Sequence, residues 1–124
     1  MIIGVGVDIV EIRRIKDILE KNNGFLEKIF TENEIKYLKS RNLRPEYVAG
    51  RFAAKEAVSK ALGTGFRGFS FKDIVVESTA LGKPIVTLMG EANTIANKFG
   101  NSKVHLSISH GCDNAIAYAV LEEC

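Results

Sequence analysis

The sequence predicts an α+β protein in which helices pack on a small, mostly antiparallel sheet. Three observations predict this class. Apolar residues recur at helical spacing in the first half of the chain, strand-like apolar runs occupy the second half, and a polar turn near the end connects two of those runs. The length of 124 residues is typical of one domain, which we expect to cover residues 1–124.

The first element is expected to be a strand with two different faces. Its residues alternate with the period of two that is typical of strands. Branched apolar residues occupy one face and glycines occur on the other: Ile3, Val5, Val7 and Ile9 alternate with Ile2, Gly4, Gly6 and Asp8. Glycines on one strand face indicate that another backbone or a ligand lies close to it.

Three helices are expected to follow this strand. The first stops at Asn22-Asn23-Gly24, because asparagine and glycine favour the left-handed backbone that ends helices. A capping box at Thr31-Glu32-Asn33-Glu34 opens the second helix. Pro45 fits the first turn of the third helix, which is expected to run to Leu62 and to end at Gly63.

Strands and one short helix are expected in the second half of the chain. A final strand over Ala115–Leu121 is expected to pair with the strand before it through the turn at residues 110–114. The earlier runs are strands around Ile74–Ser78, Ile85–Met89 and Val104–Ser109, with a short helix at Glu91–Phe99.

The charge of the chain excludes a general nucleic-acid binder. Its 17 basic and 15 acidic residues give a formal net charge of only +2. Residues 11–60 nevertheless hold 12 Lys and Arg against 8 Asp and Glu. This basic half indicates an acidic partner or a polyanionic ligand, or else a solvated helix surface.

The membrane and the secretory pathway are not expected locations. No apolar run approaches the ~18 residues that a membrane span needs. The first residues carry no basic segment and reach Asp8 too early for a signal peptide. Cys112 and Cys124 form no CxxC pair, so we expect free thiols and a cytoplasmic location.

Two carboxylates are candidates for a metal site. Glu56 lies four residues before Lys60, on one face of the third helix, and this pattern is either an ordinary ion pair or part of a site. Asp8 ends an apolar strand, where a carboxylate costs free energy unless it caps the next helix, is paired or binds a metal. Because Mg²⁺ takes one or two carboxylates and fills its shell with water and phosphate oxygens, Asp8 and Glu56 could hold it together.

Weaker candidates surround this pair. Gly63-Thr64-Gly65 follows the third helix, where it forms either a simple helix stop or a phosphate turn. His105, Ser107 and Ser109 share one strand face that leads to His110, and this face meets either a ligand or water. A metal site built from histidine and cysteine in this region lacks a fourth ligand at usual spacing.

Four segments together resemble bacterial holo-acyl-carrier-protein synthases, the small 4′-phosphopantetheinyl transferases. They are GVGVDIVE at Gly4–Glu11, RFAAKEAVSKALGTG at Arg51–Gly65, Gly82-Lys83-Pro84, and Ser107-Ile108-Ser109-His110. The resemblance covers the whole chain and implies the fold of that family. It is weakest at residues 22–46.

The resemblance implies transfer of 4′-phosphopantetheine from coenzyme A to a serine of apo-acyl carrier protein, with release of adenosine 3′,5′-bisphosphate, in support of fatty acid biosynthesis. It implies Mg²⁺, or Mn²⁺, held by Asp8 and Glu56, with Lys60 on the pyrophosphate. Glu56 or a metal-bound water would serve as general base. It also implies a homotrimer whose active sites lie between subunits.

Further residues are expected to contact coenzyme A or the carrier protein. The residues expected to line the coenzyme A site are Arg51, Lys55, Lys60, Gly63, Thr64, Gly65, Lys83, Pro84, Ser109 and His110. Arg14 and Lys21 lie seven residues apart, on one side of the first helix, and match basic positions that dock the acidic carrier protein in this family. The alternative functions are a non-catalytic nucleotide-binding module and a nucleic-acid-binding module, and the carboxylate pair and the low net charge disfavour them.

Overall fold

A computed structural model describes residues 1–21, 24–98 and 100–124. The predicted helix stop at Asn22-Asn23 and the predicted helix end at Phe99 lie outside these residues. In chain order the elements are β1 (Ile2–Glu11), α1 (Ile12–Glu20), α2 (Phe25–Ile29), α3 (Glu32–Ser40), α4 (Pro45–Ala61), the 3-10 turn η1 (Phe71–Asp73), β2 (Ile74–Ser78), β3 (Pro84–Leu88), α5 (Gly90–Ala96), β4 (Ser102–His110) and β5 (Asn114–Glu123). None of the helices described is long and apolar enough to cross a membrane.

The strands form two antiparallel sheets. One has three strands in the order β1-β5-β4, and the other is the hairpin β2-β3. The α+β class and the antiparallel pairing are therefore confirmed, including the hairpin of the last two strands, in which Val104 pairs with Leu121 and Ser109 with Ile116. The expectation of one sheet is wrong, because β3 and β4 lie near each other without forming a ladder.

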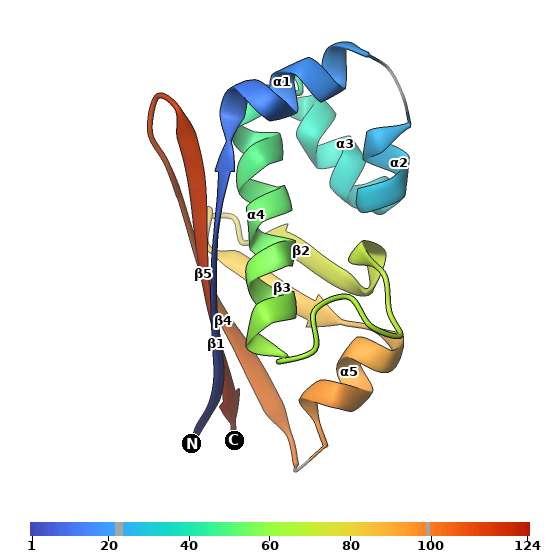
Figure 1. Cartoon of the computed structure of the whole chain (residues 1–124), viewed down its shortest axis with the longest axis vertical. Coiled ribbons are helices and arrows are strands. Elements are labelled where there is room, and N and C mark those ends of the chain that lie inside the picture. The colour runs from blue at the N-terminus through green and yellow to red at the C-terminus, as the bar shows by residue number, and fades with distance from the viewer. Residues whose placement is uncertain (22–23, 99) are drawn as a thin grey trace.

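Helix α4 is the centre of the fold. It packs along one face of the three-stranded sheet, with the β2-β3 hairpin on its other side and α1, α2 and α3 near its N-terminal end (Figure 1). Alanines on both surfaces make this contact close, since Ala53 and Ala57 of α4 and Ala117 of β5 have almost no exposed surface. Pro45 occupies the first turn of α4, as predicted.

The glycines of β1 face α4. A Cβ atom added to Gly4 would lie 1.9 Å from the carbonyl oxygen of Ala61, and one added to Gly6 would lie 2.0 Å from that of Ala57. The close approach of a second backbone is confirmed. It brings the face of β1 that carries Asp8 directly against the helix.

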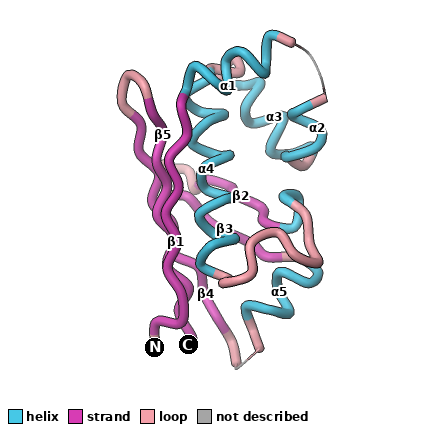
Figure 2. Tube along the Cα trace, viewed as in Figure 1, coloured by secondary structure: helices cyan, strands magenta, loops and turns pink. Residues whose placement is uncertain are grey.

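The other face of the three-stranded sheet is uncovered and largely apolar. None of the helices that the structure describes lies on that side of β1, β5 and β4 (Figures 1 and 2). The exposed apolar side chains there come from β1 and β5: Ile3, Val5, Val7, Ile9, Ile116 and Tyr118. Patches of this kind mark association surfaces.

The helices at the N-terminal end of α4 agree with the sequence signals except for α2. The capping box of α3 is present, with Thr31 and Glu34 each accepting from the backbone N–H of the other residue. The five residues of α2 are too few to show helical periodicity, so this helix was not predicted. Helix α5 begins at Gly90 and ends at Ala96, near the predicted bounds.

Candidate functional site

Asp8, Glu56 and Lys60 come together where β1 faces the C-terminal half of α4. The ammonium of Lys60 lies 3.2 Å from Oδ1 of Asp8 and donates to the carbonyl oxygen of Val7 at 2.9 Å. The Asp8 side chain is 19% exposed and that of Lys60 is 53% exposed. Because Gly6 lets the strand approach α4, the short Asp8 side chain reaches a residue on the helix.

The carboxylates of Asp8 and Glu56 lie near each other in this group of residues. The pKa of Glu56 lies above its ordinary value, because burial and then the nearby Asp8 carboxylate disfavour its charged form. The charges of Lys60 and Arg14 act in the opposite direction without cancelling this rise. Because burial and the Asp8 carboxylate both disfavour the charged form of Glu56, a positive charge added between the two carboxylates would be favourable.

The donor set fits Mg²⁺. The ligands on offer are carboxylate oxygens from two elements, which are the hard ligands that this ion prefers. The described residues contain no group of three or more His, Cys, Asp or Glu side chains suited to a metal. A two-carboxylate site leaves most of the coordination shell to water and to a phosphate-bearing substrate.

Lys55 lies outside this group, and its expected phosphate contact is corrected to a structural role. Its side chain is 0% exposed, and its ammonium lies 2.8 Å from Oε1 of Glu34. It also donates to the carbonyl oxygens of Ile29 at 3.0 Å and Phe71 at 2.9 Å. Burial lowers the pKa of Lys55, and Glu34 opposes that shift. An ammonium with three buried partners has no donor left for a phosphate.

A second group of predicted residues lines a cavity on the far side of α4. Arg51, Pro84 and His110 border a space of about 190 Å³. The ring of Tyr47 meets that of His110 edge-on, with ring centroids 6.0 Å apart. The other lining residues are Tyr37, Glu46, Gly50, Ser78, Gly82 and Ile108. This mixture of rings, apolar walls and one guanidinium suits a nucleotide.

No pattern in the sequence selected Tyr37 or Ser78 as site residues. The guanidinium of Arg51 lies 4.8 Å from the ring centroid of Tyr37, and its Nη2 donates to Oγ of Ser78. These three residues belong to α3, α4 and β2, far apart along the chain. Only the packing of these elements brings the side chains together.

The remaining predicted residues lie at the edges of these two groups. Gly63 and Gly65 take positive φ angles directly after α4, on the Lys60 side, and Thr64 donates to the carbonyl oxygen of Gly65. Lys83 is exposed beside Pro84, in the wall of a neighbouring cavity. Ser109 is exposed on β4, on the face opposite to Ile108, as its strand position predicts.

Helix α4 separates the two groups within one chain. Asp8 pairs with Ala117 of β5, which in turn pairs with Ile108 of β4. Asp8 and the cavity wall are thus two strand spacings apart, roughly 10 Å. Ala117 lies between them, buried beneath α4. The carboxylate pair therefore lies on one flank of α4 and the cavity on the other.

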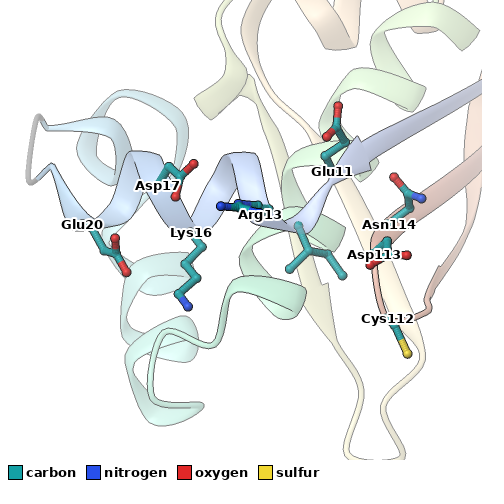
Figure 3. A pocket seen from close by; sticks show the side chains of 9 residues that line it. Glu11, Arg13, Lys16, Asp17, Glu20, Cys112, Asp113 and Asn114 are labelled. Atoms are coloured by element: carbon teal, nitrogen blue, oxygen red, sulfur yellow. The ribbon is translucent and has the colours of Figure 1, made fainter.

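Helix α1 presents basic residues beside the carboxylate flank. Arg14 and Lys21 are both exposed, and the charge of Arg14 reaches Glu56. A different side of α1 borders a shallow pocket of about 690 Å³ (Figure 3). That pocket contains side chains of both signs, such as Lys16 and Asp17, and none of the predicted catalytic residues.

Comparisons with known proteins agree with one another. A family model described as the 4′-phosphopantetheinyl transferase superfamily matches residues 4–119. A holo-[acyl-carrier-protein] synthase of Clostridium kluyveri is 70% identical over 122 residues, which cover 98% of this chain and 91% of that protein.

Solved structures give the same result. The crystal structure of a holo-[acyl-carrier-protein] synthase from Neisseria meningitidis is similar with a TM-score of 0.89 and 38% identity, covering 99% of this chain and 100% of that one. A synthase from Bacillus anthracis in complex with CoA (3′,5′-ADP) is similar with a TM-score of 0.82 and 46% identity, covering 100% and 99%.

Proposed function

Because the chain belongs to the 4′-phosphopantetheinyl transferase superfamily, as an enzyme of its holo-acyl-carrier-protein synthase type, we propose how its residues carry out that transfer. The substrates are coenzyme A and a serine of apo-acyl carrier protein. The serine oxygen forms a bond to the β-phosphorus of coenzyme A, and the bond from that phosphorus to the bridging oxygen breaks. The products are the phosphopantetheinyl serine, adenosine 3′,5′-bisphosphate and one proton. The product serves fatty acid biosynthesis in the cytoplasm.

The carboxylate pair is the observation that carries this proposal. Asp8 and Glu56 would hold Mg²⁺, or Mn²⁺, which neutralises charge on the pyrophosphate when bound. Lys60 has three N–H donors, two of which bind the carbonyl oxygen of Val7 and the carboxylate of Asp8, and its exposed ammonium would balance the charge of the leaving bisphosphate. The turn at Gly63, Thr64 and Gly65 continues this flank.

The cavity on the other flank of α4 would take the nucleotide end of coenzyme A. Arg51 supplies a fixed positive charge, and Pro84 and His110 supply flat surfaces for a base or ribose. Lys83 and Ser109 are exposed, and each adjoins in sequence two residues that line the cavity. Lys55 is left out, because its ammonium is fully buried.

The active site is proposed to form between two copies of the chain in a trimer. A single chain has its carboxylate pair and its nucleotide cavity on opposite flanks of α4, with the helix between them, and in the proposed trimer one coenzyme A molecule would contact the two groups from neighbouring subunits. The uncovered apolar face of the three-stranded sheet supplies a surface for this association, with residues such as Val5, Val7 and Tyr118.

The carrier protein is proposed to dock on α1. Arg14 and Lys21 are exposed on this helix, and acyl carrier proteins are strongly acidic. Since the charge of Arg14 already reaches Glu56, a carrier bound there would bring its serine near the carboxylate flank. The two alternative functions, nucleotide-binding and nucleic-acid-binding modules without activity, are not favoured.

The transfer is tested by incubating the protein with an apo-acyl carrier protein, coenzyme A and Mg²⁺. Mass spectrometry of the carrier should show a gain of one phosphopantetheine, and omission of Mg²⁺ with a chelator present should abolish it. An unchanged carrier mass with a folded enzyme would refute the proposed function.

The shared site is tested by mixing two inactive variants. Glu56→Gln damages the carboxylate flank and Arg51→Ala damages the cavity, so mixed trimers contain some sites with both halves intact. After subunit exchange at equal concentrations, about a quarter of the sites should be undamaged. If the mixture stays as inactive as its components, each site belongs to one chain.

A further inference from the structure

Three side chains meet in the wall of the nucleotide cavity. Arg51 comes from α4, Tyr37 from α3 and Ser78 from the end of β2. The positions of all three depend on the packing of α3 and the β2-β3 hairpin against α4. Substitution of any one of them would leave the carboxylate pair on the other flank of α4 in place.

The guanidinium of Arg51 is held on two sides. Its central carbon lies 4.8 Å from the centroid of the Tyr37 ring, within the range of a cation–π interaction. Its Nη2 donates to the hydroxyl oxygen of Ser78. A long, flexible side chain is thereby restricted to one orientation, which removes most of the entropy that it would lose on binding an anion.

One donor of this guanidinium is unused. Nη1 of Arg51 is buried and has no acceptor among the residues that the structure describes. Buried donors in folded proteins almost always have an acceptor, because an unpaired one has lost its water without compensation. An oxygen that enters the cavity with a ligand would supply that acceptor.

Arg51 and Ser78 also change the pKa of Tyr37. Burial alone would raise its pKa, but hydrogen bonding and charge from Arg51, together with a hydrogen bond from Ser78, bring the pKa below its ordinary value. The guanidinium that lies over the ring thus also favours the charged form of the phenol, an electrostatic interaction that phenylalanine could not make.

We propose that Tyr37 and Ser78 are positioning residues that hold Arg51 in the cavity wall so that its free Nη1 donor binds a phosphate oxygen of the nucleotide. This inference rests on the proposed function, since it assumes that coenzyme A occupies the cavity. Arg51 is the residue that contacts the phosphate. Tyr37 and Ser78 act only through it.

A phosphate is the anion that fits this arrangement. A planar guanidinium fork matches the oxygens of a phosphate, and the remaining walls from Pro84, Ile108 and His110 suit the base and sugar attached to it. Coenzyme A offers two sources of such oxygens, the 3′-phosphate and the diphosphate. Coenzyme A and 3′-dephospho-coenzyme A distinguish them.

The experiment is a double-mutant cycle on the binding of coenzyme A, measured by titration calorimetry without carrier protein. The single variants are Arg51→Ala, Tyr37→Phe and Ser78→Ala, and each of the last two is also combined with Arg51→Ala. Thr87→Ala removes a hydroxyl from an exposed position on the same hairpin, away from the cavity, and is the control. Thermal melts confirm that each variant folds.

Arg51→Ala should weaken the binding of coenzyme A by at least about tenfold, the range for a charge-assisted hydrogen bond. Tyr37→Phe and Ser78→Ala should each weaken it by roughly threefold to tenfold, and neither should weaken it further when Arg51 is alanine. Thr87→Ala should bind like the wild type. If the 3′-phosphate is the source, the variants should bind 3′-dephospho-coenzyme A as the wild type does; if the diphosphate is, both ligands should be weakened equally.

Two results would overturn the inference. Wild-type affinity in Tyr37→Phe and Ser78→Ala would show that Arg51 needs no positioning. Effects that add fully to that of Arg51→Ala would show that the two residues act independently of it. A wild-type protein that binds no coenzyme A at all would instead refute the proposed function, and the inference with it. If Ser78→Ala fails to fold, Tyr37→Leu takes its place, because phenylalanine keeps the ring contact with Arg51 and leucine removes it.

Discussion

The buried Lys55 leads to a prediction that separates a structural role from a phosphate-binding role. Lys55→Met keeps the length of the side chain and removes its charge, so the packing of the stem changes little. The substitution removes the ammonium from three partners, the carboxylate of Glu34 and the carbonyl oxygens of Ile29 and Phe71. We expect a large loss of stability and no direct effect on coenzyme A.

The magnitude follows from the burial of both charges. The side chain of Glu34 is 4% exposed, and after the substitution its remaining partners among the described residues are the backbone N–H groups of Thr31 and Val76. Removing one partner of a buried ion pair typically costs about 3–5 kcal/mol, because the other charge stays buried without compensation. For a chain of this size, 1 kcal/mol changes the melting temperature by roughly 4 °C. The melting temperature of Lys55→Met should therefore fall by roughly 12–20 °C.

The assay is thermal and urea unfolding of Lys55→Met, together with the KM for coenzyme A well below the melting temperature. The control is the double variant Lys55→Met/Glu34→Gln, which removes the uncompensated buried charge. Its single amide oxygen can accept from only one of the backbone N–H groups of Thr31 and Val76, so it should recover part of the lost stability. A melting temperature within about 3 °C of the wild type, combined with a raised KM for coenzyme A, would refute this account and restore the phosphate contact.

Further predictions concern the carboxylate flank and α1. Glu56→Gln and Asp8→Asn should each lower turnover by more than about 100-fold at saturating Mg²⁺ with unchanged circular dichroism, and near-normal turnover would contradict the metal assignment. Since the folded protein raises the pKa of Glu56, the stability associated with its protonated form is present at low pH and lost as pH rises through that raised pKa. Without Mg²⁺, the melting temperature of Glu56→Gln should thus exceed that of the wild type by a margin that grows as the pH rises from about 4 to about 7. A margin that stays constant with pH would exclude this cause. Arg14→Glu should raise the KM for the carrier protein by about tenfold and leave that for coenzyme A unchanged; added salt should close the gap, and unaltered kinetics at low salt would exclude docking on α1.

Local signals in the sequence predicted the elements that depend on local physics. The capping box at Thr31, the proline that opens α4 and the paired glycines of β1 each require only neighbouring residues or a simple periodicity, and each has the predicted structural counterpart. The spacing of residues in the sequence does not by itself predict the contact between Asp8 and Lys60. The family resemblance, rather than the pattern of residues, selected them.

The errors arose where distant segments decide the outcome. Lys55 follows Arg51 by one helical turn of α4, as a surface cation would, and no residue near it in the sequence indicates its contact with Glu34. Tyr37 and Ser78 were missed for the same reason, since 40 residues lie between positions 37 and 78 along the chain. The separation into two sheets also depends on tertiary packing, since β1 and β5 pair across most of the chain while β3 and β4, with α5 between them in sequence, do not.

The glycines of β1 set the distance between β1 and α4, and with it the distance from Asp8 to Lys60 and Glu56. Replacing Gly6 by alanine would place a methyl group 2.0 Å from a backbone oxygen of α4. A backbone atom cannot move aside as the end of a flexible side chain can. Strand and helix would have to separate by roughly 1 Å or more. Asp8 is two residues farther along the same face, so such a separation would also stretch its 3.2 Å approach to Lys60 and widen the gap to Glu56. At the proposed metal site, the span between the two carboxylates is in this way set by two positions that bear no side chain, and a Gly6→Ala protein that still folds should lose more affinity for Mg²⁺ than for coenzyme A.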